Sequence, residues 1–312
     1  MEKFKHIQRI KEIYANGGNI IKFLKTDRTG ERNTIEDILI SYDLQAGAYT
    51  QHLAKNYAFK VSYSKALANV LKGLGQFDSV MEVGVGEATT LAMLIKNMDR
   101  RPKHLLGFDI SWSRLKFAKE LLQGFGIDEV ELFTADLFEI PLMDNSVDIV
   151  YTSHSIEPNG GREEAALKEL ARVAKKYVVL LEPSSEFASE EARNRMKAHG
   201  YVSDLRATAE KLGLNVTDHR LFDLSANPLN PTGLMVIEKD PVKGSGPELV
   251  CPVTHTPLAP YDRSLLFSAE SCLAYPVIDG IPCLLKDNAI LATHLLTNYE
   301  EFRSTHGVSF NG

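Results

Sequence analysis

The chain lacks the features typical of secreted, membrane and nucleic-acid-binding proteins. Its 312 residues include three cysteines, Cys251, Cys272 and Cys283, which are too few and odd in number for a secreted disulfide framework. No apolar run approaches the roughly 20 residues of a membrane span. Residues 1–6 lack the hydrophobic core of a signal peptide, so we expect a cytoplasmic protein without membrane partners. A net charge of −6 argues against a broad phosphate-binding surface.

The composition is that of an ordinary globular protein. Hydrophobic residues make up 44% of the chain, which is typical of a protein with a buried core. A length of 312 residues exceeds one typical domain. We therefore expect one large domain and a smaller appendage.

Residues 80–90 predict an apolar strand, a glycine-rich turn and then a helix. Gly84 and Gly86 have no Cβ atom, so a ligand can approach the backbone, and the helix that follows points free N–H groups at the turn. Such a turn is typical of cofactor sites, although a Gly-x-Gly by itself also occurs in purely structural turns.

Two more predicted strands have a carboxylate at their end or just after it. Residues 104–109 end at Asp109, 25 residues past Gly84, which is the interval at which an acidic side chain can accept hydrogen bonds from a ribose. Thr89 stands where a dinucleotide-binding turn requires glycine or alanine, so hydride transfer is disfavoured. Residues 130–134 lead into Ala135-Asp136-Leu137, where an acceptor could face an adenine edge.

Strands and helices alternate through this region. We expect strands at 78–83, 104–109, 129–134, 147–152 and 177–182, helices at 88–98, 112–124, 162–175 and 188–213, and a final pair of strands at 214–222 and 234–237. This order predicts an α/β fold, with a mainly parallel sheet covered by helices on both faces.

The ordered motifs over residues 66–240 resemble those of class I S-adenosylmethionine-dependent methyltransferases, of the kind that includes ubiquinone-biosynthesis C-methyltransferases. The resemblance implies a Rossmann-like, seven-stranded sheet and S-adenosylmethionine as cofactor. It implies that Gly84 and Gly86 pass under the methionine part, Glu82 reaches its amino group through water, Asp109 binds the ribose hydroxyls, Asp136 and Leu137 frame the adenine, and Ile110, Ala135 and Ser153 complete the cofactor site.

The first 76 residues look helical, with Thr34 as an expected helix cap. In the related enzymes, a segment such as 1–65 forms a lid that supplies part of the acceptor pocket. The resemblance therefore implies that Tyr42, Tyr49 and His52 bind substrate. Tyr42 and Tyr49 would share one helical face if residues 44–53 are helical, although core packing would explain the same spacing.

The residues after the fourth strand of the domain, 152–158, lie where a catalytic base is expected. They lack the Asn-Pro-Pro-Tyr of adenine and amide methylation and the Pro-Cys of cytosine carbon methylation. His154 has a suitable ordinary pKa for a base, and Glu157 could pair with it or bind a substrate hydroxyl. His154 could instead cap the strand or stack on the cofactor. Arg162, at an expected helix start, could hold an anionic substrate group or belong to an ordinary turn.

Residues 241–247 form a linker rich in glycine and proline. Residues 248–288 resemble a small zinc-ribbon-like domain, related to the activator subunit shared by eukaryotic tRNA, rRNA and release-factor methyltransferases and also found as a short bacterial protein. The string Leu-Ala-Tyr-Pro…Asp-Gly-Ile-Pro over 273–282 carries this resemblance, and a tail follows at 289–312.

The expected zinc positions in this ribbon-like domain are mostly vacated. Alignment on the family pattern places Cys251, Thr254, Ser268 and Ser271 there, whereas tetrahedral zinc needs four convergent cysteine or histidine ligands. A rearranged site of Cys251, His255, Cys272 and Cys283 fits no ribbon spacing. We expect no metal, and we expect the domain to be stabilised by docking its apolar residues Val250, Leu273, Tyr275, Ile278 and Ile281 onto the methyltransferase domain.

These observations favour an enzyme that methylates an oxygen or nitrogen of a small molecule, such as a sugar or another biosynthetic metabolite. Two alternatives remain open. One is an RNA or protein methyltransferase with its activator domain fused in cis. The other is a noncatalytic module that binds a cofactor or a partner.

Overall fold

A computed structural model describes residues 2–18, 20–24, 33–222, 224–225, 227–240, 242, 244–305 and 307. Parts of the predicted lid (1, 19 and 25–32), linker (241 and 243) and tail (306 and 308–312) lie outside the described residues. No helix in the described ranges is both long and apolar enough to cross a bilayer.

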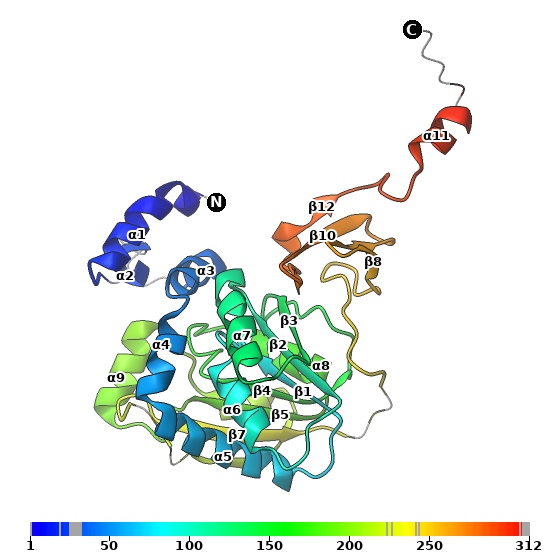
Figure 1. Ribbon diagram of the computed structural model, residues 1–312. Helices are drawn as coiled ribbons and strands as arrows, with labels where there is room; N and C mark the ends of the chain where they lie inside the picture. Colours follow the sequence, from blue (N-terminus) through cyan, green and yellow to red (C-terminus); the bar gives the residue numbers. More distant parts are fainter. Residues whose placement is uncertain are drawn as a thin grey trace.

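The main domain is built around a seven-stranded sheet (Figure 1). Its strands are β1 (Ser79–Val83), β2 (His104–Asp109), β3 (Val130–Thr134), β4 (Val147–Ser153), β5 (Ala174–Pro183), β6 (Asn215–Leu221) and β7 (Thr232–Glu238). They lie in the order β3-β2-β1-β4-β5-β7-β6, and β7 runs antiparallel to both of its neighbours. The predicted fold class is confirmed, because this is a mixed α/β sheet with a terminal antiparallel pair.

Helices cover both faces of this sheet. They are α5 (Tyr57–Gly73), α6 (Thr89–Asn97), α7 (Trp112–Gly124), α8 (Glu163–Val173), α9 (Glu190–His199) and α10 (Leu205–Lys211). Successive side chains of a strand point to opposite faces of the sheet, so neighbouring residues of β1 belong to two different hydrophobic cores. Val80 packs with residues of α5, α6 and α7, and Met81 packs with residues of α8 and α10.

The single helix expected over 188–213 is wrong, because the structure has two helices there. Gly200 ends α9 with φ +69°, a left-handed conformation that glycine adopts at little cost. The chain then runs without helix until Asp204, and α10 begins at Leu205.

The N-terminal region is helical, as predicted. It comprises the 3₁₀ helix η1 (Glu2–His6) and helices α1 (Ile7–Ala15), α2 (Ile20–Leu24), α3 (Ile35–Leu44) and α4 (Ala48–Lys55). Thr34 caps α3 as expected, since its side chain accepts the N–H of Asp37 and the Asp37 carboxylate accepts the N–H of Thr34. In Figure 1, α3 and α4 lie against the main domain, whereas α1 and α2 lie farther out.

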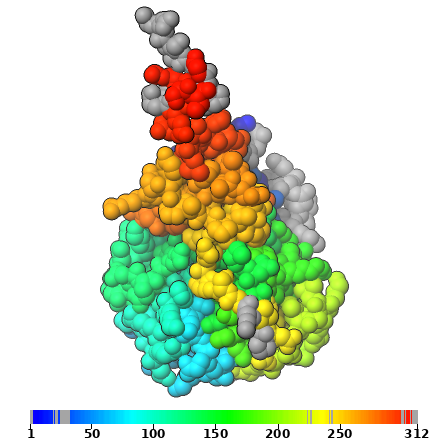
Figure 2. Space-filling view, turned by 90° about the vertical axis from the view of Figure 1, so that its right-hand side faces the viewer, coloured from blue at the N-terminus to red at the C-terminus, as the bar shows by residue number. Residues whose placement is uncertain are grey.

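The C-terminal region forms a small second sheet. Its elements are β8 (Ala259–Asp262), β9 (Leu265–Ser268), β10 (Leu273–Ile278), β11 (Ile281–Pro282), the 3₁₀ helix η2 (Lys286–Asn288), β12 (Ile290–Leu291) and α11 (Tyr299–Thr305). Figure 2 shows this region, in gold and orange, seated on the main domain, with the red C-terminal part projecting away from it.

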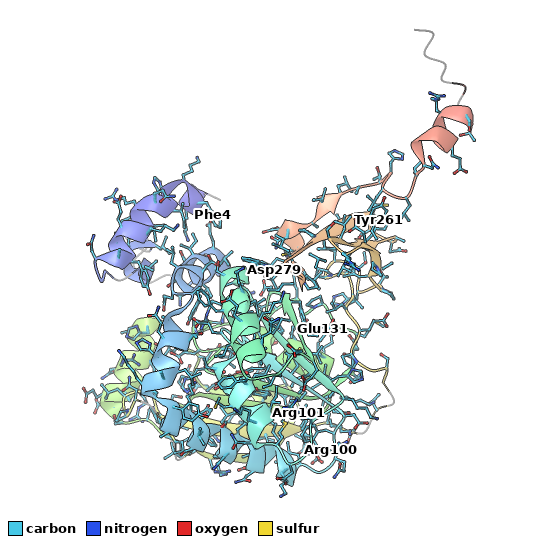
Figure 3. All side chains as sticks on the ribbon, in the orientation of Figure 1. Phe4, Arg100, Arg101, Glu131, Tyr261 and Asp279 are labelled. Atoms are coloured by element: carbon cyan, nitrogen blue, oxygen red, sulfur yellow. The ribbon has the colours of Figure 1, made fainter. Side chains whose placement is uncertain are left out.

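The small sheet contacts the β3 edge of the large one. The N–H of Leu284 donates to the carbonyl of Thr134 at 3.1 Å, and Thr134 pairs with Cys283 as an isolated parallel bridge. Asp279, labelled in Figure 3 beside α7, lies 3.4 Å from Lys119 and 3.6 Å from Lys116. Of the apolar residues expected to dock, Val250, Tyr275 and Ile281 are buried, Leu273 is half-buried, and Ile278 is 49% exposed.

Candidate functional site

A cavity of about 860 Å³ lies at the carboxyl ends of β1, β2, β3 and β4. Helices α3, α4 and α5 and the loop before β7 complete its wall. It brings together the predicted site residues Tyr42, Tyr49, His52, Glu82, Gly84, Gly86, Asp109, Ile110, Ala135, Asp136, Leu137, Ser153, His154 and Glu157. The predicted residue Arg162 does not line it. A cavity of this size, formed at the strand ends of an α/β sheet, is typical of small-molecule sites.

The glycine-rich turn forms one wall of the cavity and has no room for side chains. Gly84 has φ +65° and Gly86 has φ +55°. A Cβ atom on Gly84 would overlap Cβ of Ser155, and one on Gly86 would lie 2.7 Å from the Arg114 guanidinium. Both positions therefore require glycine for conformation and for space.

Asp109 ends β2 inside the cavity and is 5% exposed. Its Oδ2 accepts the N–H of Gly86 at 3.0 Å, and its Oδ1 accepts the N–H of Ser111 at 2.9 Å. Nη1 of Arg114 lies 3.8 Å from Oδ2. Because each carboxylate oxygen can accept more than one hydrogen bond, Asp109 fixes the turn and keeps acceptor capacity toward the cavity.

Glu82, near the end of β1, is buried beneath the same turn. Its Oε2 accepts the hydroxyl of Tyr151 at 2.8 Å. Burial raises the pKa of Glu82 to about 8, against the opposing effects of Tyr151 and the nearby Lys60. Lys60, from α5, donates to Oγ1 of Thr90 at 3.3 Å and lines the cavity, and burial lowers its pKa.

The segment after β3, residues 135–138, also lines the cavity. Oδ1 of Asp136 accepts the N–H of Phe138 at 3.0 Å, and burial raises the pKa of Asp136. The guanidinium of Arg162 lies 3.3 Å from the centre of the Phe138 ring. Arg162 thus contacts Phe138, a residue of the cavity wall, and its contact with an anionic substrate group stays a prediction.

His154 follows β4 with both ring nitrogens in contact with protein groups. Nδ1 lies 2.9 Å from Oε2 of Glu157, and Nε2 lies 2.8 Å from Oγ1 of Thr232, the first residue of β7. Burial alone would raise the pKa of Glu157, but hydrogen bonds from His154, Tyr201 and Asn230 bring it below its ordinary value. The predicted pairing of His154 with Glu157 is present, and an ionised Glu157 favours a proton on Nδ1.

Glu182 of β5 supports the loop that carries His154. One carboxylate oxygen accepts the N–H groups of Ser155 at 3.0 Å and Ile156 at 3.3 Å, and the other accepts that of Glu157 at 3.1 Å. Burial raises the pKa of Glu182 to about 7, against the effect of His154. The loop that carries His154 is thus held by hydrogen bonds to Glu182, a side chain that does not line the cavity.

Tyr42 and Tyr49 lie on different helices, so the condition for a shared helical face, a continuous helix over 44–53, is not met. Helix α3 ends at Leu44, and α4 begins at Ala48 after Gly47, which has φ +93°. The two rings nevertheless meet at Arg114, whose guanidinium carbon lies 5.2 Å from the ring centre of Tyr42 and 4.6 Å from that of Tyr49. His52 lines the cavity from α4 and is exposed.

The vacated zinc positions gather around a hydrogen-bonded thiol. Sγ of Cys251 lies 3.3 Å from the hydroxyl of Tyr275 and 3.5 Å from that of Ser271, and the N–H of Ser271 donates to Ser268 at 3.3 Å. Across the described ranges, three or more histidine, cysteine, aspartate or glutamate residues nowhere gather as metal ligands would. Cys251, His255, Cys272 and Cys283 therefore do not converge.

The comparisons with known proteins identify the main domain. Residues 80–177, which include the glycine turn, Asp109, Asp136 and His154, match the family described as "Methyltransferase domain". The chain carries a class I S-adenosylmethionine-dependent methyltransferase domain. Such a domain is enzymatic, and its cofactor is S-adenosylmethionine.

Two known proteins are similar to this chain, one in fold and one in sequence. An O-methyltransferase family protein from Burkholderia thailandensis has the same fold, with a TM-score of 0.50, 13% identity and coverage of 72% of this chain and 71% of that one. Malonyl-(acyl-carrier protein) O-methyltransferase of Marinomonas sp. (strain MWYL1) is 28% identical over 130 residues, which cover 38% of this chain. The methyltransferase spans 47%, about half, of that relative's length.

A further segment of 43 residues is 58% identical to a UPF0434 protein from Acidovorax sp. (strain JS42). It covers 13% of this chain and 70% of that protein, and a UPF0434 protein from Polaromonas sp. (strain JS666 / ATCC BAA-500) matches it at 56%. This segment of the methyltransferase belongs to the UPF0434 family. It is small enough to correspond to the predicted ribbon-like domain.

Sequence reasoning missed several residues that shape the site. Among them are Lys60, Glu87, Arg114, Glu182 and Thr232. Glu87 directly follows Gly86, and Glu182 lies within an apolar stretch of sequence. An acidic residue in such a place is expected to be buried and paired, so both residues could have been found from the sequence. Thr232 and Arg114 carried no local signal, because their partners come from distant parts of the chain.

Proposed function

We propose that this enzyme transfers a methyl group from S-adenosylmethionine to an oxygen or nitrogen of a small-molecule acceptor, such as a sugar or another biosynthetic metabolite, in the cytoplasm. The observation that carries this proposal is the single cavity that joins the predicted cofactor residues to His154 and Glu157 under the helices α3 and α4. The O-methyltransferase name of the Marinomonas relative favours oxygen.

The side chains on the cofactor side suit this cofactor. Asp109 would offer acceptors for the ribose hydroxyls, Asp136 and Leu137 would frame the adenine, and the turn at Gly84 and Gly86 would let the methionine part approach the backbone. Lys60 would suit its carboxylate, and Glu82 its amino group. When bound, the cofactor supplies an electrophilic methyl group on a positively charged sulfur.

Two buried polar atoms on the acceptor side could form hydrogen bonds with a substrate. Oγ of Ser155 and Oδ1 of Asn230 are buried and have no hydrogen-bond partner among the residues that the structure describes, and both residues line the cavity. A hydroxyl or amine of the acceptor would satisfy them, since buried polar groups are normally hydrogen-bonded. Tyr42, Tyr49 and His52 would supply the outer wall of the acceptor pocket.

His154 is proposed as the base for acceptors that must lose a proton. With its proton on Nδ1, held by Glu157, the lone pair on Nε2 is the group that takes a proton. Thr232 occupies that lone pair in this structure, so the acceptor's hydroxyl would have to take the place of the threonine hydroxyl. The rest of the catalysis is positioning in line and exclusion of water.

The charges around the cavity favour a small molecule over RNA. Lys60 and Arg114 are the lysine and arginine side chains that line it among the described residues. Arg114 is engaged by Asp109, Tyr42 and Tyr49, and Lys60 by Thr90. Recognition of an RNA backbone needs clustered cations that are free to meet phosphates.

We further propose the division into a lid (1–65), a methyltransferase domain (66–240), a linker (241–247), a ribbon-like domain (248–288) and a tail (289–312), with the ribbon-like domain docked in cis. The function is tested by incubating the enzyme and labelled S-adenosylmethionine with metabolite extract, total RNA and total protein in parallel. Label should enter a metabolite. Label confined to RNA or protein would support the alternative in which the fused domain marks a macromolecular substrate.

A further inference from the structure

Glu87 connects the glycine-rich turn to the lid. It directly follows Gly86 and is 1% exposed. Its Oε1 accepts the N–H groups of Gly47 at 3.0 Å and Tyr49 at 3.3 Å. Its Oε2 accepts both the N–H and the hydroxyl of Thr50, each at 2.6 Å.

These contacts make Glu87 the cap of helix α4. The residue before the helix, Gly47, has no side chain to cap it, and the first N–H groups of a helix need an outside acceptor. A carboxylate at this end also interacts favourably with the helix dipole. The cap here comes from a residue about 40 positions away in the sequence, on the segment that lies under the predicted methionine site.

A second carboxylate, that of Asp43, also connects the lid to the main domain, but here the lid supplies the acceptor and the main domain supplies the donors. Oδ1 of Asp43, near the end of α3, accepts the hydroxyl of Ser111 at 2.6 Å and the N–H of Ser113 at 3.3 Å. The N–H of Ser111 in turn donates to Asp109. The turn between α3 and α4 is therefore tied on one side to the glycine-rich turn and on the other to the residue predicted to bind the ribose.

Helix α4 carries Tyr49, His52 and Leu53 into the cavity wall. A change in the glycine-rich turn on cofactor binding would reach these side chains through Glu87. The lid would respond to the cofactor only if its closed position and the bound turn stabilise each other, which is the condition for coupling between two sites.

We propose that Glu87 is a positioning residue that couples cofactor binding at the glycine-rich turn to closure of α4, so that the acceptor pocket is completed only after the cofactor binds. This inference rests on the proposed function. It predicts ordered binding, cofactor first, and assigns to Glu87 no contact with the acceptor.

The test uses S-adenosylhomocysteine as the probe and hydrogen exchange of the amides of residues 47–50 as the readout. In the wild-type chain the ligand should slow exchange of the Gly47, Tyr49 and Thr50 amides at least about tenfold, because these three donate to Glu87, whereas the N–H of Ala48 donates to the carbonyl of Gln45. Glu87→Gln, which cannot accept from all of these donors, should lose most of that slowing and bind the ligand about three- to tenfold more weakly. Gln51→Ala, an exposed position on the same helix, should behave like the wild type.

Thr50→Val supplies a second variant, on the lid side, in case Glu87→Gln folds poorly. It removes the hydroxyl that donates to Oε2, so it should weaken the ligand-dependent protection in the same direction, and the double variant should add little further. With an acceptor in hand, both variants should raise its KM more than they lower kcat. A merely structural role would lower the thermal transition and leave the ligand-dependent change in exchange intact.

Two outcomes separate the inference from the proposed function. If the wild-type chain does not bind S-adenosylhomocysteine, the cofactor site is wrong and the inference falls with it. If the ligand binds but exchange at residues 47–50 does not respond to it, or responds equally in Glu87→Gln, the inference alone is overturned.

Discussion

The Nε2 atom of His154 lies 2.8 Å from Oγ1 of Thr232, the first residue of β7. This contact joins the loop after β4 to the terminal antiparallel strands, and it occupies the ring nitrogen that a base would use. Thr232 is fully buried and lines the cavity. The contact thus relates the orientation of His154 to the position of β7.

The base role of His154 can be tested by removal of its ring. His154→Ala should lower turnover about 10²- to 10⁴-fold and leave cofactor affinity within about twofold of the wild type, because a general base acts only on the acceptor. Steady-state kinetics with the identified acceptor and calorimetry with S-adenosylhomocysteine measure the two effects. Thr232→Val is the matched control, since it keeps the ring and frees Nε2. Unchanged turnover in His154→Ala would remove this residue from the mechanism.

Loss of the Asp109 carboxylate should weaken cofactor binding. Asp109→Ala removes charged hydrogen bonds to the ribose hydroxyls and to the N–H groups of Gly86 and Ser111, which should cost about 1.5–3 kcal/mol, or roughly ten- to a hundredfold in affinity. Calorimetry with S-adenosylhomocysteine checks this. Asp99→Ala, at an exposed surface position, is the control and should bind normally. Equal affinity in Asp109→Ala would show that the ribose lies elsewhere.

The raised pKa of Glu82 should make stability depend on pH in the absence of cofactor. A carboxyl with a pKa of about 8 in the folded chain and about 4.5 in the unfolded chain takes up a proton on folding at pH values between these two. The folded state then binds more protons, so the free energy of unfolding falls as pH rises from about 5 to 8. Glu82→Gln should reduce this fall by a few kcal/mol, on the order of one per pKa unit.

Denaturant unfolding of wild type and Glu82→Gln at several pH values measures that difference. Glu182, whose pKa burial raises to about 7, adds a similar slope in both proteins, so only the difference between them reports Glu82. Parallel curves for the two proteins would mean that Glu82 is ionised in the folded chain.

Docking of the ribbon-like domain should stabilise it in place of a metal. About 40 residues are too few to form an adequate core alone. A chain of residues 246–312 should show no cooperative thermal transition by circular dichroism, and a chain of residues 1–245 should be less soluble because an apolar patch is uncovered. A cooperative transition in the isolated segment, or stoichiometric zinc in the purified protein, would contradict this account.

Two substitutions in β10 refine that test within the full chain. Tyr275 is fully buried in the core shared with the main domain, whereas Ile278 is 49% exposed. Tyr275→Ala should therefore cost about 3–5 kcal/mol of unfolding free energy, and Ile278→Ala under about 1 kcal/mol. Equal effects would mean that the small sheet does not depend on this core.

The sequence by itself determined the sheet-and-helix order and the positions of the cofactor motifs. The strand at 104–109 and the helix at 112–124 follow the expected bounds because apolar periodicity is a local property, readable within a dozen residues. The glycines at 84 and 86 and the carboxylate of Asp109 lie at fixed spacings along one βαβ unit. Local chain geometry therefore brings them together.

Only the tertiary structure decided how helices α3 and α4 and the side chain of His154 are held. Arg114 between Tyr42 and Tyr49, Glu87 at the start of α4 and Thr232 beside His154 each join residues about 40 to 80 positions apart. The sequence around one residue of such a pair contains no local pattern from which the other residue could be predicted. These contacts depend on how the helices and the antiparallel strands pack against the sheet, and packing is a property of the whole chain.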